Sequence, residues 1–248
     1  MRPLPGGNVA LVCAAVHDGR PVVLKANPRG TPDDAGLASQ GAALAFWRPS
    51  GGAVELLGAR DDGFTLMLER AQPGDSLDGT DLAWAEKLAV LGRLARRLHA
   101  AGAPPPGTVI PMSDYVSGWG DGASELEGLL APSPGDVLVH ADLHPGNALR
   151  VDGSWKAIDP HGARGDRNAE IWALLCPEAP GIPDAPAEAR RIAWRRLRIY
   201  ADAAGLDPGR AALWARVRAA AEAEWPDVAD DPEWAERLRR LARALSVD

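Results

Sequence analysis

The sequence has few cysteines and no long apolar run, and these absences limit the classes of protein it can belong to. Its 248 residues include two cysteines, Cys13 and Cys176, which lie far apart and form no CxxC pair. We therefore expect neither a disulfide scaffold nor a thiolate metal site, and both thiols are interpreted as reduced and buried. No segment is long and apolar enough to span a membrane, and the first residues lack a signal-peptide core, so we expect a cytoplasmic protein with no membrane partner.

Lysine is also scarce, because Lys25, Lys87 and Lys156 are the only three in the chain. The net charge of −7 at pH 7 disfavours non-specific binding to nucleic acid and suits a cationic small substrate. Apolar residues make up 46% of the chain and charged residues 25%, as in an ordinary globular protein. At this length the chain can form one large domain or two lobes.

The most informative stretch runs from Val137 to Asp159. It begins with a short β-branched strand that leads into a polar loop. Two apolar runs follow, joined by an Asp-Gly pair that is a strong signal for a tight hairpin turn. The hairpin would bring Asp159 back to the loop that holds Asp142 and Asn147, so the sequence predicts that three polar side chains converge at one place.

Phosphoryl transfer from a nucleotide needs side chains of this kind. One carboxylate orients and deprotonates the attacking hydroxyl, and oxygen ligands hold Mg²⁺ against the phosphates. Asp142 precedes Asn147 by five residues, the spacing of the kinase loop H-R-D-x-x-x-x-N, and Asp159 follows where the D-F-G aspartate would stand. The pattern favours Asp142 as the catalytic residue and Asn147 and Asp159 as Mg²⁺ ligands.

The loop His140–Asn147 reads H-A-D-L-H-P-G-N, and I-D-P follows the hairpin. These residues resemble the H-x-D-x-H-x-x-N and I-D-P motifs of the aminoglycoside phosphotransferase family, and residues 158–166 are similar to its streptomycin 6-kinase and hydroxyurea phosphotransferase branch. The resemblance implies an α+β, two-lobed protein-kinase-like fold, with a small strand-rich lobe over residues 1–71 and a larger, mainly helical lobe over residues 72–248. It also implies transfer of the γ-phosphoryl group of ATP or GTP, with Mg²⁺, to a hydroxyl of a small antibiotic, an aminoglycoside such as streptomycin.

In the amino-terminal part, the resemblance assigns nucleotide binding to Lys25, near the end of an expected hairpin, in a strand that reads V-V-L-K. Gly6 and Gly7, before the first expected strand, would bring backbone N–H groups to the phosphates. Backbone groups of Glu69 and Ala71 would contact the purine at the hinge. The chain starts only a few residues before the glycines, so we expect the lobe to lack its first edge strand, or the true start to lie upstream.

Other residues would support this site. A helix is expected over Asp33–Trp47, and relatives place a glutamate on it to pair with the lysine. Gln40 aligns with that position, and because it carries no charge we expect the lysine to be held less firmly. By the same resemblance, His140 braces the catalytic loop, and either Asp166 or Glu170 hydrogen-bonds the backbone of the loop.

The acceptor pocket would be shaped by the segment between residues 107 and 135 and by the last helices. An acidic and aromatic pocket would suit a guanidinium or ammonium sugar. Each candidate for contacting the acceptor can equally be a solvated surface or core residue. The candidates are His144, Asp114, Asp121, Glu125, Glu224, Asp227 and Trp225.

Three alternatives remain open on the sequence alone. The acceptor could be hydroxyurea or a housekeeping metabolite. The short start and Gln40 would also fit an impaired kinase that binds nucleotide without transferring phosphate. A metal hydrolase would instead use as zinc ligands His140, Asp142, His144 and His161. We expect a monomer or weak dimer with no nucleic-acid partner.

Overall fold

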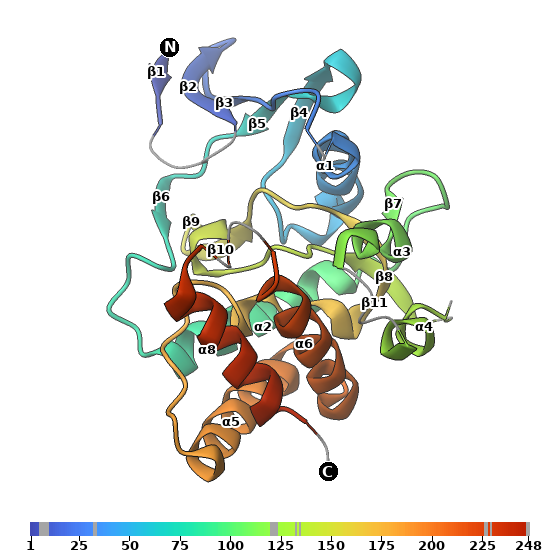
Figure 1. Ribbon diagram of the computed structural model, residues 1–248. Helices are drawn as coiled ribbons and strands as arrows, with labels where there is room; N and C mark the ends of the chain where they lie inside the picture. Colours follow the sequence, from blue (N-terminus) through green and yellow to red (C-terminus); the bar gives the residue numbers. More distant parts are fainter. Residues whose placement is uncertain are drawn as a thin grey trace.

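The amino-terminal part of the chain forms a five-stranded antiparallel sheet, at the top of the view in Figure 1. The computed structural model describes residues 1–4, 10–31, 34–119, 124–131, 133, 135–225, 228 and 230–246. In sheet order, the strands are β1 (Arg2–Pro3), β2 (Leu11–His17), β3 (Arg20–Ala26), β5 (Thr65–Glu69) and β4 (Leu56–Arg60). The first edge strand, which the sequence led us to expect to be missing, is present as the two-residue β1. A strand this short has no hydrophobic alternation that a sequence could reveal.

One helix, α1 (Asp34–Trp47), packs beside this sheet, as the sequence predicted. At its first turn the carboxylate of Asp34 accepts the backbone N–H groups of Gly30 and Thr31, each at 2.8 Å. Leu44 and Trp47 are fully buried in the core that the helix shares with the rest of the molecule. The helix therefore anchors the sheet to the larger, carboxy-terminal part of the chain.

The carboxy-terminal part is mainly helical (Figure 1). Its helices are α2 (Trp84–His99), α3 (Met112–Tyr115), α4 (Ser124–Leu130), α5 (Pro186–Ala204), α6 (Pro208–Glu222) and α8 (Pro232–Ala244). The described residues also contain single-turn 3₁₀ helices, of which η1 (Arg48–Ser50) and η2 (Asp61–Gly63) lie in the amino-terminal part and η3 (Ser117–Trp119), η4 (Pro145–Asn147), η5 (Arg167–Ala169) and η6 (Trp172–Leu174) in the carboxy-terminal part. Helix α2 starts at Trp84, because Glu86 accepts the N–H of Ala83 at 2.9 Å and so fixes the first turn there.

Two three-stranded sheets lie between the helices and the amino-terminal sheet. One has the order β10-β9-β6 and the other β7-β11-β8. Their strands are β6 (Pro73–Ser76), β7 (Ile110–Pro111), β8 (Asp136–Val139), β9 (Ala148–Val151), β10 (Ser154–Ala157) and β11 (Ala163–Asp166). Strand β8 is buried at Val137, Leu138 and Val139, so the loop that follows it starts from a rigid base.

The predicted α+β fold, with a strand-rich first part and a helical second part, is confirmed. Strand β5 ends at Glu69, and β6, which pairs with β9 of the second part, begins at Pro73. We therefore propose a lobe boundary near residue 71. None of the helices in the described ranges is both long and apolar enough to cross a membrane.

Helix α2 packs closely against α5 at Gly92. A Cβ atom added there would lie 2.7 Å from the Cβ of Ala203 and 2.7 Å from the carbonyl oxygen of Tyr200. Real side chains do not tolerate such distances, and the neighbouring atoms belong to the core and the backbone of α5. The glycine thus sets the spacing between the two helices that support the catalytic part of the molecule.

We expect Gly92→Ala to lower the free energy of unfolding by about 1–3 kcal/mol, the usual cost of overpacking a core, even though alanine is the better helix former. Urea unfolding would measure the change. Gly128→Ala in α4 is the matched control, because an added Cβ there would meet no atom within 4 Å. An unchanged or increased stability of Gly92→Ala would contradict the close packing of α2 on α5.

Candidate active site

The loop after β8 brings together the polar side chains that the sequence predicted to converge. The side-chain amide of Asn147 donates to the backbone carbonyl of Asp142 at 3.0 Å and to its carboxylate Oδ2 at 2.8 Å. The hairpin of β9 and β10 turns at the Asp-Gly pair, where both residues have positive φ. The returning chain is tied to the loop because the N–H of Ile158 donates to the carbonyl of Asn147 at 3.0 Å. This bond places Asp159 beside the loop.

A lysine from the amino-terminal sheet reaches this second acid. Lys25, on β3, is 7% exposed, and its ammonium group forms an ion pair with Asp159. The same group donates to Oε1 of Gln40 at 2.8 Å, while Nε2 of Gln40 donates to Oδ1 of Asp159 at 3.1 Å. Burial raises the pKa of Asp159, but the charge and hydrogen bond of Lys25 outweigh this and hold that pKa below its ordinary value.

Gln40 thus makes contacts that a glutamate could not reproduce. Its carbonyl accepts from Lys25 and its amide donates to Asp159, whereas a carboxylate has no proton to donate at neutral pH. The side chain is 3% exposed, so water does not satisfy it instead. The glutamine thus joins the lysine to the acid.

A cleft of about 550 Å³ opens between the two parts of the chain at this point. Its polar lining includes Lys25, Asn147 and Asp159, and its apolar lining includes Val23 and Leu68. Glu69 and Ala71, the predicted hinge residues, also line it. An apolar slot that contains a cation and oxygen donors can hold an aromatic ring with an anionic tail. The predicted glycines Gly6 and Gly7 lie outside the described residues.

Two side chains at the cleft could hold a divalent cation. Because Nδ2 of Asn147 is bonded to Asp142, its Oδ1 is the atom available to a metal ion, next to the carboxylate of Asp159. This pair fits Mg²⁺, which takes few protein ligands and completes its shell with water and phosphate oxygens. Within the described parts of the chain, no three His, Cys, Asp or Glu side chains gather as a metal site. The zinc-hydrolase alternative therefore has no ligand set there.

His140 braces the loop from inside. It is fully buried and stacks on Trp47 of α1, with ring centroids 6.0 Å apart. Its Nδ1 accepts the N–H of Asp142 at 3.3 Å, so the proton lies on Nε2, which donates to the carbonyl of Ile158 at 2.9 Å. Burial lowers the pKa of His140, which favours the neutral ring that this pattern requires.

Of the two acids expected to support the loop, Glu170 contacts its backbone. Its carboxylate accepts the N–H of His140 at 2.6 Å and the N–H of Ala141 at 3.2 Å. Asp166 instead accepts the indole N–H of Trp214 at 2.7 Å and forms an ion pair with Arg210, both on α6. Asp166 therefore fixes the position of α6, and Glu170 fixes the loop.

One acceptor candidate belongs to the catalytic loop itself. His144 forms an ion pair with Glu178, with 3.1 Å between Nδ1 and Oε1. Burial lowers the pKa of His144, but Glu178 and the nearby acids outweigh this and raise it above its ordinary value. Burial likewise opposes ionisation of Glu178, yet the neighbouring imidazole brings its pKa down to about 2. The pair with Glu178 therefore favours the protonated form of His144.

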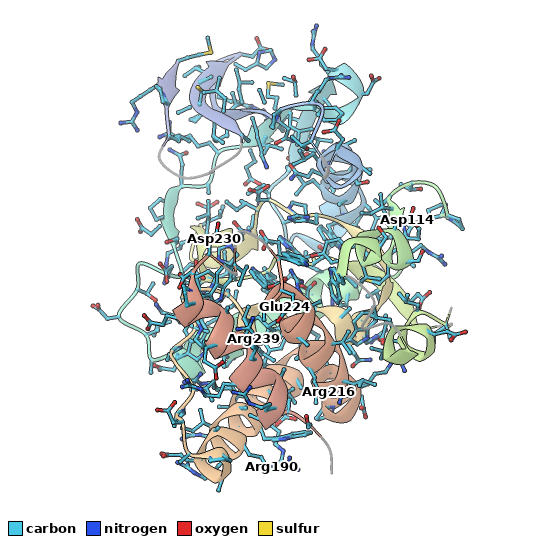
Figure 2. The ribbon with its side chains drawn as sticks, viewed as in Figure 1. Asp114, Arg190, Arg216, Glu224, Asp230 and Arg239 are labelled. Carbon is cyan, nitrogen blue, oxygen red and sulfur yellow. The ribbon has the colours of Figure 1, made fainter. Side chains whose placement is uncertain are left out.

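The remaining acceptor candidates are spread over the surface. Glu224 forms an ion pair with Arg239 of α8 at 3.0 Å, and both are labelled in Figure 2, away from the exposed Asp114 on α3. Trp225 is half-buried against the hydrophobic core. Three further candidates lie outside the described residues, Glu125 by its side chain alone: Asp121, Glu125 and Asp227.

A buried ion pair that was not expected from the sequence lies next to the loop His140–Asn147. Arg218 of α6 donates to Oε1 of Glu222 at 2.7 Å and to the backbone carbonyl of Ala141 at 2.8 Å. The guanidinium also lies 4.3 Å from the ring centroid of Trp172. Opposite charges four residues apart on an otherwise apolar helix face were the signal for such a pair. Glu178, in a proline-rich loop, had no comparable signal.

Comparison with known proteins supports the family that the sequence motifs resemble. Residues 3–230 match the family described as aminoglycoside/hydroxyurea antibiotic resistance kinase. The chain is 32% identical over 201 residues to the streptomycin 6-kinase of Streptomyces griseus, covering 72% of this chain and 63% of that protein. It therefore spans less than two thirds of that relative. It is 29% identical over 245 residues to the hydroxyurea phosphotransferase of Kitasatospora aureofaciens, covering 90% and 67% of the two chains.

Among solved structures, the chain is similar to a thermostable mutant of aminoglycoside phosphotransferase APH(4)-Ia, in a ternary complex with AMP-PNP and hygromycin B. The TM-score is 0.59 at 20% identity, with 99% of this chain and 94% of the other covered. At this identity the likeness concerns the fold, and it is the kinase-like fold that the motifs implied. The chain belongs to the aminoglycoside/hydroxyurea antibiotic resistance kinase family.

Proposed function

We propose that this chain is a small-molecule O-phosphotransferase that moves the γ-phosphoryl group of ATP or GTP to a hydroxyl of an antibiotic. The observation that carries the proposal is that Asn147, which is hydrogen-bonded to Asp142, lines a cleft together with Asp159 and Lys25. Family membership supports the same chemistry. The cleft has the apolar walls that a purine needs and the charged groups that its phosphates need.

In the proposed mechanism, the carboxylate of Asp142 receives the hydroxyl proton as the acceptor oxygen attacks the γ-phosphorus. The bond between the γ-phosphorus and the bridging oxygen breaks, and the nucleoside diphosphate leaves. The amide of Asn147 holds Asp142 at 2.8 Å, which keeps the carboxylate in one orientation. A Mg²⁺ ion held by Asn147 and Asp159 would neutralise charge on the phosphates. Lys25 would then exchange its contact with Asp159 for one with a phosphate.

For the acceptor, we propose an aminoglycoside such as streptomycin, because the relative from S. griseus is named a streptomycin 6-kinase. The net charge of −7 suits a polycationic substrate. Hydroxyurea is the second candidate, because the relative from K. aureofaciens carries that name and covers 90% of this chain. The two acceptors differ strongly in size and charge, so turnover distinguishes them directly.

Asp142→Ala should lower kcat by about 10²–10⁴-fold, the usual contribution of a positioned general base. Phosphate transfer would be followed with Mg²⁺ and either ATP or GTP, across streptomycin, other aminoglycosides and hydroxyurea. Asp202→Asn, at an exposed position on α5, is the control and should retain full activity. Nucleotide binding by the wild type without transfer to any of these acceptors would instead favour an impaired, kinase-like binding protein.

Gln40→Glu should make the protein depend more strongly on Mg²⁺. Without metal, one ammonium group must then serve two adjacent carboxylates, whereas a cation at Asp159 relieves their repulsion. We expect a lower Tm than the wild type without metal, and a larger rise in Tm on adding Mg²⁺ with a non-hydrolysable nucleotide. The control is Gln72→Glu. Gln72 is the only other glutamine in the chain and, unlike Gln40, it is exposed. Equal Mg²⁺-dependent shifts in all three proteins would refute the role assigned to Gln40.

The His144–Glu178 ion pair should stabilise the protein less at acid pH and less at alkaline pH than between them. The pKa of Glu178 falls from 4.5 to about 2 on folding, so its contribution is complete above 4.5 and is lost as the pH falls toward 2. The pKa of His144 rises above 6.5, so its contribution is complete below 6.5 and is lost as the pH rises through the folded value.

Urea unfolding of the wild type and of Glu178→Gln should therefore differ most between about pH 4.5 and 6.5. The difference should shrink at more acid and at more alkaline pH. Glu188→Gln, at an exposed position in the first turn of α5, is the control and should show a small difference. A difference between Glu178→Gln and the wild type that does not change with pH would contradict the pair.

A further inference from the structure

The residue before the proposed base has a backbone conformation that side chains rarely adopt. Ala141 has a φ of 68°, in the left-handed region, where its Cβ crowds the neighbouring carbonyl. It is 1% exposed, so water does not hold it there. A strained conformation of this kind persists only where the surrounding structure fixes it. The groups that hold Ala141 therefore hold the start of the catalytic loop.

Two side chains from distant parts of the sequence hold the carbonyl of Ala141. Arg218 donates to it through Nη1 at 2.8 Å, and the hydroxyl of Tyr115 donates to it at 3.1 Å. This carbonyl belongs to the same rigid peptide unit as the N–H of Asp142. Fixing its direction therefore fixes the direction in which the chain enters Asp142.

Both donors are themselves held in place. Arg218 is 5% exposed, and its guanidinium pairs with Glu222 at 2.7 Å and lies over Trp172. The ring of Tyr115 packs edge-on against Trp119, with centroids 5.9 Å apart. Neither donor is among the residues that line the nucleotide cleft. Arg218 and Tyr115 can therefore support Asp142 from the side of the loop that faces away from the nucleotide cleft.

We propose that Tyr115 and Arg218 are positioning residues that keep Ala141 in its left-handed conformation and thereby orient the carboxylate of Asp142 toward the acceptor hydroxyl. The part of this proposal that concerns catalysis rests on the proposed phosphotransferase function. The part that concerns the loop backbone does not. The two parts are tested by separate measurements.

Tyr115→Phe removes one donor and leaves the ring and all charges in place. We expect kcat to fall about tenfold, while KM for nucleotide and for acceptor changes less than about twofold, because a small misplacement affects the reacting geometry more than binding. The chain offers a matched control in its only other tyrosine, Tyr200, which is 1% exposed and whose hydroxyl has no hydrogen-bond partner in the described residues. Tyr200→Phe should retain the wild-type kcat.

The left-handed conformation of Ala141 allows a second test. Its expected result would not be seen if Tyr115 had only a structural role. In the Ala141→Gly background this conformation is no longer strained, so the loop depends less on the two donors. The loss caused by Tyr115→Phe should shrink from about tenfold to less than about threefold. Arg218→Lys, which keeps a charge beside Glu222 but loses the guanidinium fork, should show the same rescue.

Hydrogen–deuterium exchange provides a readout that needs no turnover. Amide exchange in a peptide covering residues 138–148 should be faster in Tyr115→Phe than in the wild type and unchanged in Tyr200→Phe. Unchanged exchange in Tyr115→Phe would overturn the proposal, whether or not the protein transfers phosphate. An equal loss of kcat in the Ala141 and Ala141→Gly backgrounds would overturn it too. If the wild type transfers no phosphate but Tyr115→Phe alters exchange as expected, the proposed function is refuted. The support of the loop backbone by Tyr115 and Arg218 would still hold.

Discussion

The proposed site depends on one buried carboxylate, Glu170. An ionised acid without exposure to water is costly unless hydrogen bonds replace the lost solvent, and the backbone N–H groups of a loop are equally costly to bury without acceptors. Glu170 meets both requirements at once, because its two oxygens accept the consecutive N–H groups of His140 and Ala141. The antiparallel pairing of β8 with β11, in which Val139 lies opposite Ala163, brings these groups together.

The same loop is tied to the amino-terminal sheet through Asp159 and Lys25, whose ion pair closes across the cleft. Backbone hydrogen bonds reinforce this link, since the N–H of Val54 donates to the carbonyl of Ala157 at 3.0 Å. A ligand in the cleft would therefore compete with contacts that already join the two parts of the chain.

The catalytic loop was predictable from the sequence because its geometry is local. The five-residue spacing of Asp142 and Asn147 fits a hydrogen bond between their side chains, and an Asp-Gly turn returns Asp159 over a short distance. The α+β fold followed from the family resemblance, and helix α1 also from the spacing of its apolar residues. The two-residue strand β1 and the start of α2 were not predictable in this way, because each depends on a single backbone or capping contact.

The side chains that support the loop could not be predicted from local spacing. Arg218 lies 77 residues from Ala141, and no local spacing relates them; the contact exists because Asp166 holds α6 through Trp214 and Arg210. The four-residue spacing of Arg218 and Glu222 is that of an ordinary helical pair, and only packing turns the guanidinium toward the loop. The residues proposed to react can thus be found from their spacing, since the proposed chemistry fixes their mutual distances. Residues that aim them can be found only from the fold, since any helix that reaches the carbonyl of Ala141 with a donor would serve.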